Sequence, residues 1–307
     1  MDSVASFSSR FSPLDEFPTP GLDGQPRPDY RPYRPTANGP TKSRVIDPAY
    51  LPGGEKSLSG ISIRSFLLGQ AAGTCVVLTV LLYTFSNPLW RVPFFVTSLA
   101  LFHFLEYYIT ARYNNLFATV TAFLLTQNGA AYNIAHGSAV AECLLAHLFL
   151  PDGYFEWTAA IFGGIKYQVL VGLVLMVVGQ IVRSLAMAQA GVSFTHTIQH
   201  HRREEHSLVK EGIYSIFRHP SYFGFFWWGL GTQLVLGNAV CFLGYAAVLW
   251  EFFSSRIRST FSSMIMARGK NADYLPDVEE EMLLIKFFGK EYVEYRSKTW
   301  VGIPGIR

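Results

Sequence analysis

Six apolar windows, several of membrane-spanning length, restrict what this chain can fold into. They cover residues 61–84, 91–110, 132–150, 167–190, 221–236 and 238–254. A helix needs ~20 residues to cross the ~30 Å hydrocarbon layer of a bilayer. Half of the 307 residues are hydrophobic and only 15% are charged, which is too apolar for an ordinary soluble domain. The sequence therefore predicts an all-α, polytopic membrane helix bundle of about six spans.

Three local patterns refine this bundle. Gly237 and Asn238 separate the last two windows, which predicts a tight helical hairpin. Residues 115–128 form a weaker stretch, for which a seventh span and an interfacial helix are both open. Small residues recur in the fourth window at intervals of seven, seven and four, which predicts a close helix–helix seam. They are Gly172, Gly179, Ala186 and Ala190.

Two ionisable residues lie within the second window. His103 and Glu106 are three apart and share one helical face. Ionisable groups at membrane depth usually face a bundle interior, so the spacing predicts a His–Glu pair that locks two helices together. Glu142 and His147 repeat the pattern more weakly in the third window.

Lys and Arg gather in three segments: the N-terminal tail, the stretch after the fourth window and the C-terminal tail. The connections 85–90 and 151–160 carry neither residue. Because Lys and Arg mark the cytosolic side, six spans place both termini and the central polar stretch in the cytosol.

The chain divides into three parts by composition. Residues 1–58 are Pro-rich and predicted to be disordered, because they cannot bury enough apolar surface to offset their ordering entropy. Residues 59–195 are predicted to form the transmembrane bundle, and 196–307 a third region that contains the longest polar stretch after the tail. No signal peptide or C-terminal prenylation box is expected.

A polar stretch from Gln199 to Tyr222 lies between the membrane-length windows and carries four of the eight histidines. Such a segment is the natural place for a site. Pro220 is favoured at a first helical position, so a helix should begin there and present amide groups suited to an anion. From composition alone, an ordinary helix start at the membrane surface explains these residues as well.

A metal site is not expected. His196 and His200 have the i, i+4 spacing of a helical chelate, and HxxxHH is similar to a histidine box of membrane di-iron hydroxylases. Those enzymes need about three such boxes, and this chain has one. The three cysteines lie in apolar windows and are interpreted as small buried hydrophobes. They are Cys75, Cys143 and Cys241.

The C-terminal region contains an amphipathic helix. It starts at Glu279, Glu280 and Glu281, where acidic residues suit a helix N-terminus. Its apolar face is predicted to consist of Leu283, Leu284, Phe287 and Phe288.

Taken together, these motifs resemble the protein-S-isoprenylcysteine O-methyltransferases from about residue 100 onward. The shared segments are HFLEY, Gln199, HSLVKEGIYSIFRHPSYFG, FFSSRI, EEEMLLIKFFGKEYVEYR and GIP. The RHPxYxG part also occurs in phospholipid N-methyltransferases and sterol reductases, whereas the C-terminal part is more specific. The resemblance implies methylation of the C-terminal carboxylate of a farnesylated or geranylgeranylated cysteine at the endoplasmic reticulum.

The resemblance also implies S-adenosylmethionine as methyl donor, prenylated CaaX-processed proteins such as small GTPases as partners, and a C-terminal helix that covers the donor. Arg256 and Glu280 would line the substrate side as the candidate catalytic residues. The implied donor-binding residues are Gln199, His206, Ser207, Leu208, Val209, Tyr214, His219, Pro220, Ser221 and Tyr222.

The implied chemistry agrees with the residues. A carboxylate with a pKa of ~3.5 is already ionised in the cytosol, so no general base is required. The protein must align the reactants and exclude water, and the guanidinium fork of Arg256 suits a carboxylate. No strand followed by GxGxxG is present, which argues against a Rossmann-type methyltransferase.

One departure from the family pattern is the segment 259–278, which separates the RI and EE pairs. Gly269, Asn271 and Pro276 suggest a loop. Either this loop is extruded and Glu280 still reaches the site, or the C-terminal helix is misplaced. A gene-model error would look the same.

Three alternatives remain open: a phospholipid N-methyltransferase, a sterol reductase, and a catalytically impaired membrane protein that binds prenylated peptides. The nucleophile of a phospholipid N-methyltransferase is an amine, which does not require an arginine such as Arg256 to bind a carboxylate. A sterol reductase should have roughly ten spans.

Overall fold

The computed structural model describes residues 47–149, 159–204, 206–257 and 280–306. The insertion 259–278 and residues 1–46 of the predicted tail lie outside these ranges. The end of that tail is described: it contains the 3₁₀ turn η1, Pro48–Tyr50. The Glu55 carbonyl also accepts a hydrogen bond from the Val120 amide at 2.8 Å.

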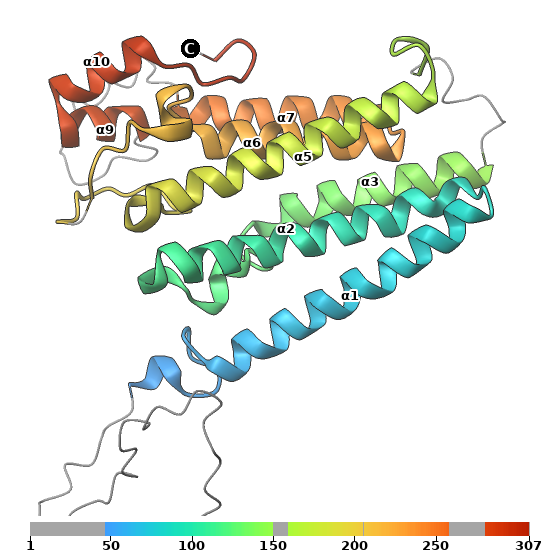
Figure 1. Ribbon diagram of the computed structural model, residues 1–307, viewed down its shortest axis with the longest axis horizontal. Helices are drawn as coiled ribbons and strands as arrows, with labels where there is room; N and C mark the ends of the chain where they lie inside the picture. The colour runs from blue at the N-terminus through green and yellow to red at the C-terminus, as the bar shows by residue number, and fades with distance from the viewer. Residues whose placement is uncertain (1–46, 150–158, 205, 258–279, 307) are drawn as a thin grey trace, which may run out of the picture. The chain divides into compact units, whose positions relative to one another are not determined.

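In the described residues, six long helices make up the bundle, and they coincide with the six predicted windows. They lie roughly side by side, with two shorter helices at one end (Figure 1). The long helices are α1 (Leu58–Thr84), α2 (Arg91–Tyr113), α3 (Gly129–Phe149), α5 (Ile165–Ala190), α6 (Pro220–Leu236) and α7 (Val240–Ile257). The short ones are α9 (Glu280–Phe288) and α10 (Lys290–Lys298). The prediction of an all-α bundle is confirmed.

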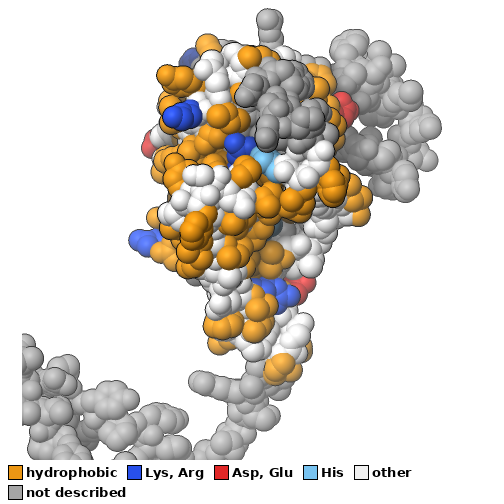
Figure 2. Space-filling view, turned by 90° about the vertical axis from the view of Figure 1, so that its right-hand side faces the viewer, with side chains coloured by type: hydrophobic (Ala, Val, Ile, Leu, Met, Phe, Trp, Pro, Cys, Tyr) orange, Lys and Arg blue, Asp and Glu red, His pale blue; other side chains and the backbone are white. Residues whose placement is uncertain are grey.

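Four segments of the described chain are long and apolar enough to cross a membrane by themselves. They are Leu58–Thr84, Pro88–Tyr113, Ile165–Ser193 and Val240–Ile257. Helix α6 has only 17 residues, fewer than the ~20 that a full crossing needs. Figure 2 views the right-hand end of Figure 1, roughly along the helices, and its described side chains are largely hydrophobic with few charged groups among them.

The predicted helical hairpin is confirmed. Gly237 ends α6 in the left-handed conformation (φ +79°), and α7 begins at Val240. The carboxylate of Glu142 on α3 caps α7, because it accepts the amides of Ala239, Val240 and Cys241 at 2.6–2.9 Å. Glu142 is therefore a helix cap.

Residues 115–128 adopt neither of the two structures that the sequence left open. They form two 3₁₀ turns, η3 (Asn115–Phe117) and η4 (Val120–Phe123), so neither a seventh span nor an interfacial α-helix is present. Phe123 is fully buried and stacks on Tyr107 at 4.2 Å. The segment folds back onto α2, so its apolar residues serve tertiary packing.

The predicted seam of small residues joins α5 to α6, the pair of helices with the most extensive contact. Gly172 and Gly179 on α5 face Gly231 and Gly224 on α6. A Cβ at Gly179 would lie 2.5 Å from the carbonyl oxygen of Gly224. The two backbones touch, as small residues allow in membranes. This contact fixes the start of α6 against α5.

We expect Gly179→Val to destabilise the protein by roughly 1–3 kcal/mol, because overpacking a close contact forces the helices apart. The measurement is the midpoint of thermal unfolding in detergent. Gly69→Val on α1 is the matched control, since a Cβ there has no neighbour within 4 Å. Equal shifts for both variants would contradict the importance of the seam.

Candidate functional site

A cavity of about 860 Å³ lies between the polar stretch, α6, α7 and the two C-terminal helices. One part is lined by polar and titratable side chains from residues 195–222. The other part is an apolar groove between α3 and α7, with Ala135 on one wall and Val248 on the other. Arg256 and Glu280 line the same cavity.

All twelve residues singled out from the sequence line this cavity. They are Gln199, His206, Ser207, Leu208, Val209, Tyr214, His219, Pro220, Ser221, Tyr222, Arg256 and Glu280. The structure thus brings together side chains spread over 82 positions, from 199 to 280. Their individual roles stay predictions.

The helix start at Pro220 is confirmed, with Pro at the first position and His219 as N-cap. The amides of Tyr222 and Phe223 both donate to the His219 carbonyl, at 3.0 and 3.1 Å. The expected row of free amides is therefore partly occupied by the chain itself. The hydroxyl of Ser221 accepts a hydrogen bond from Arg183 Nη1 at 2.9 Å.

Some of the predicted donor-binding side chains also hold the local fold. The Tyr214 hydroxyl donates to the Ala186 carbonyl at 3.2 Å, which ties its loop to α5. The Ser207 amide donates to the Ser193 hydroxyl at 3.2 Å, which joins the polar stretch to the turn that follows α5. Gln199 is half-buried, and its side-chain amide donates within its own turn, to the carbonyl and the hydroxyl of Thr197.

Arg256, Tyr222 and Glu280 meet where the polar and apolar parts of the cavity join. The Tyr222 hydroxyl donates a hydrogen bond to Glu280 Oε2 and lies within hydrogen-bonding reach of Arg256. The Arg256 guanidinium lies 4.8 Å from the ring centroid of Phe252. The sequence left open whether Glu280 still reaches the site or the C-terminal helix is misplaced. In the structure, Glu280 reaches the site.

Next to it, Glu281 anchors the C-terminal helices beneath the start of α6. This carboxylate is 1% exposed and contacts Arg218 Nε at 2.5 Å, Arg296 Nε at 2.9 Å and His219 Nε2 at 3.3 Å. Burial by itself raises the pKa of Glu281, but the hydrogen bonds and charges of His219 and Arg218 outweigh it, so the net pKa is lowered. The sequence did not distinguish Glu281 from Glu280, because a run of consecutive glutamates does not indicate which of them is buried.

The apolar face predicted for the C-terminal helix lines the cavity. It belongs to α9, and Gly289 (φ +60°) separates α9 from α10. His206 packs against Phe287 and Phe288, at centroid distances of 6.0 and 5.2 Å. Burial, followed by the charges of Arg203 and Arg202, lowers the pKa of His206. The imidazole is therefore neutral at cytosolic pH.

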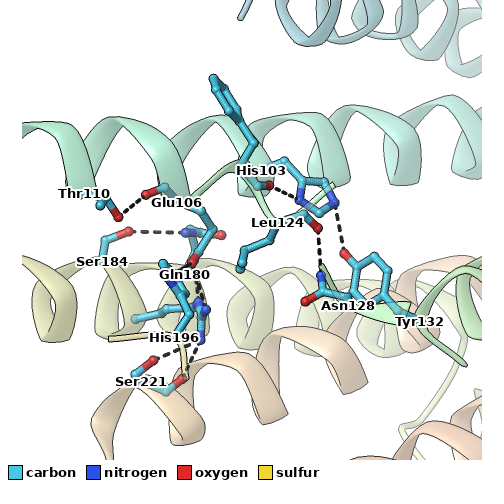
Figure 3. A network of polar contacts seen from close by, with 12 residues as sticks. His103, Glu106, Thr110, Leu124, Asn128, Tyr132, Gln180, Ser184, His196 and Ser221 are labelled. Atoms are coloured by element: carbon cyan, nitrogen blue, oxygen red, sulfur yellow. Dashed lines mark hydrogen bonds and ion pairs between the residues drawn. The ribbon is translucent and has the colours of Figure 1, made fainter. Parts of the chain in front are cut away.

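The predicted pair between His103 and Glu106 is wrong in its partners. Glu106 contacts Arg183 Nε and Nη2, at 2.5 and 2.8 Å, and His196 Nε2 at 2.9 Å. His103 instead contacts the Phe123 carbonyl at 2.8 Å and the Tyr132 hydroxyl at 3.0 Å (Figure 3). Each of the two side chains does connect α2 to another segment. The spacing of residues along α2 does not reveal a partner such as His196, which is 90 positions away from Glu106 in the sequence. In the described ranges, no group of three or more His, Cys, Asp or Glu side chains is placed to hold a metal.

Comparison with known proteins is consistent with this geometry. The model of the isoprenylcysteine carboxyl methyltransferase family matches residues 170–266. A protein-S-isoprenylcysteine O-methyltransferase of Saccharomyces cerevisiae is 41% identical over 250 residues, which are 80% of this chain and 94% of that relative. The Homo sapiens protein of the same name is 34% identical over 248 residues, covering 80% of this chain and 75% of the relative.

A solved structure of a eukaryotic intramembrane Ras methyltransferase, an isoprenylcysteine carboxyl methyltransferase, superposes with a TM-score of 0.64 at 28% identity. The match covers 80% of this chain and 77% of that one. With relatives above 30% identity over four fifths of the chain, this protein belongs to the isoprenylcysteine carboxyl methyltransferase family.

Proposed function

We propose that this protein transfers a methyl group from S-adenosylmethionine to the C-terminal carboxylate of a prenylated cysteine. One observation carries the proposal. A single cavity joins a polar, His-lined part to an apolar groove, and Arg256 lies where the two meet. A prenylated cysteine has the same two-part character, with an anionic end and a long hydrocarbon chain.

The polar part fits S-adenosylmethionine. His206 Nδ1 and the Tyr292 hydroxyl line the cavity, and both are buried without a hydrogen-bond partner among the described residues. Buried polar atoms of this kind require a partner, which a bound donor would provide. Aromatic side chains from α9 and the neutral His206 suit the adenine end. When bound, the donor supplies a methyl group activated by a sulfonium, and no metal is needed.

Arg256 holds the acceptor. A C-terminal carboxylate, with a pKa of ~3.5, is ionised in the cytosol and needs no base to become a nucleophile. The guanidinium fork of Arg256 stays charged and matches the carboxylate. Holding the reactants in line supplies several kcal/mol of the rate enhancement. The aromatic rings around Arg256, including Phe252 and Phe253, exclude water from the reacting oxygen.

The apolar groove holds the prenyl chain. One face of α7 lines it from Cys241 to Arg256, a distance of about 22 Å at ~1.5 Å per residue. Ile134 on α3 and Val248 on α7 both line this groove and are exposed, which supports entry of a hydrocarbon chain sideways from the bilayer. The partners are then prenylated CaaX-processed proteins such as small GTPases.

We expect the Gly244→Leu variant to methylate a substrate with the longer geranylgeranyl chain less well than one with a farnesyl chain. Gly244 lines the groove about 18 Å from Arg256 along α7, at ~1.5 Å per residue. A Cβ there meets no atom within 4 Å, so a larger side chain fills the far end of the groove without strain. Methylation of geranylgeranylcysteine should fall by at least roughly tenfold relative to farnesylcysteine, because each CH₂ left unburied costs ~0.8 kcal/mol and about two such groups already amount to a factor of ten. An unchanged ratio of the two methylation rates would show that the prenyl chain does not bind in this groove.

The distribution of charge supports an orientation in the membrane. Basic residues occur with the polar part of the cavity and are absent from the connections at 85–90 and 151–160. We propose that the protein lies in the endoplasmic reticulum membrane with both termini and the donor-binding part in the cytosol.

The test is transfer of radiolabelled methyl from S-adenosylmethionine to N-acetyl-S-farnesylcysteine by membranes that contain the full chain. Base-labile label is expected, as for a methyl ester. A parallel chain without residues 259–278 shows whether the insertion is tolerated. Label only in this shortened chain would identify the full chain as catalytically impaired. Label in phospholipid instead would favour an N-methyltransferase.

A further inference from the structure

Glu106 is a fully buried carboxylate that the proposed reaction does not use. It lies on α2, is 1% exposed, and does not itself line the cavity. It nevertheless contacts two side chains that do, Arg183 and His196. Burying a charge is costly unless it is paired, and Glu106 is paired with both of these side chains.

The first arm of this network runs through Arg183 on α5. Its Nε and Nη2 hold the two oxygens of Glu106 at 2.5 and 2.8 Å, a bidentate pair with fixed geometry. Its Nη1 donates to the hydroxyl and the carbonyl of Ser221, at 2.9 and 3.3 Å. The guanidinium lies 5.3 Å from the rings of Phe102 and of Phe225. Arg183 therefore links Glu106 to the first turn of α6.

The second arm runs through His196. Its Nε2 lies 2.9 Å from Glu106 Oε2, and Figure 3 shows both residues. His196 belongs to the segment 193–199, which lines the polar part of the cavity and ends at Gln199. A second bond from the end of α2 holds the same segment, since Asn114 Nδ2 donates to the Phe194 carbonyl at 2.9 Å. One carboxylate thus orients both walls of the polar part.

We propose that Glu106 is a positioning residue for the donor. It acts through Arg183 and His196, which set the start of α6 and the segment 193–199 at the spacing that the donor requires. The inference rests on the proposed function, because it assigns the polar part of the cavity to S-adenosylmethionine. In the described part of the chain, the hydrogen bonds and ion pairs of the Glu106 side chain go to Arg183 and His196 and not to α3 or α7, which form the acceptor groove, so we expect the effect to be specific to one substrate.

The test measures binding of radiolabelled S-adenosylmethionine to the full chain in detergent, and the two KM values in membranes. Glu106→Gln keeps the shape of the side chain but removes its charge. We expect its donor Kd and donor KM to rise at least about tenfold, with the KM for N-acetyl-S-farnesylcysteine within about twofold of wild type. Glu142→Gln is the matched control, since Glu142 is also a helix-borne carboxylate in the bundle but caps α7. Its donor KM should not change.

His196→Gln is the second variant, because it removes only one arm and leaves the Glu106–Arg183 pair in place. Its donor KM should rise by about threefold or more. Unchanged donor binding in both variants, or an equal rise of both KM values, would overturn the proposal. A merely structural role would lower the amount of folded protein and the maximal rate without changing the donor Kd. If the wild type binds the donor but does not methylate prenylcysteine, the proposed function fails while the donor Kd still tests Glu106.

Discussion

Replacing Arg256 with Ala is expected to reduce kcat/KM for a prenylcysteine substrate by roughly 30- to 150-fold. A hydrogen bond to a charged group contributes about 2–3 kcal/mol, and the variant removes the carboxylate's partner at the junction of the cavity. The loss should appear in the KM of the acceptor, while the KM of S-adenosylmethionine changes by less than about threefold. Initial rates with each substrate varied in turn provide the measurement.

The control for this variant is Arg256→Lys. It keeps the positive charge but loses the planar fork, so it should recover only part of the activity. If both KM values rose equally in Arg256→Ala, Arg256 would not be a clamp specific to the acceptor. The Tyr222 hydroxyl lies between Arg256 and Glu280, so Tyr222→Phe provides a further comparison that leaves both charges in place.

Replacing Glu281 with Ala is expected to destabilise the docked C-terminal helices by roughly 3–5 kcal/mol and to abolish methyl transfer. Removing one partner of a buried ion pair leaves the other charge without compensation. Here the partner left behind is Arg218, whose side chain is only 3% exposed. Because α9 lines the cavity and carries Glu280, its release opens the donor-binding part to water. Limited proteolysis together with thermal unfolding in detergent measures the release.

The same carboxylate makes stability depend on pH. The folded-state pKa of Glu281 is lowered, so its contribution is present above its unfolded pKa of ~4.3 and is lost as pH falls through the folded value. Wild type should therefore lose stability in acid more steeply than Glu281→Gln. Glu291→Ala is the matched control. Its pair with Lys210 is about half exposed on both sides, so water screens it and it contributes little to stability. Equal acid sensitivity of wild type and Glu281→Gln would exclude this role.

Patterns local to the chain determined the elements of the fold. Apolar windows placed the six long helices, and Pro220 and Gly237 marked the two ends of α6. The spacing of small residues identified the seam of α5, because a backbone contact requires the absence of a side chain at each close approach. The twelve candidate site residues were found through motifs, which preserve residue type and order. All of them line one cavity, although what each of them binds stays a prediction.

Only the tertiary structure decided which charged groups meet. Glu106 pairs with Arg183 and His196 and not with His103, and Glu281 rather than Glu280 is the buried anchor. Residues 115–128 fold against α2 as two short turns. In each case the outcome depends on which way a side chain or loop faces across contacts distant in sequence. A pattern along the chain records local conformation and burial, whereas the partner of a buried charge is set by the packing of helices around it.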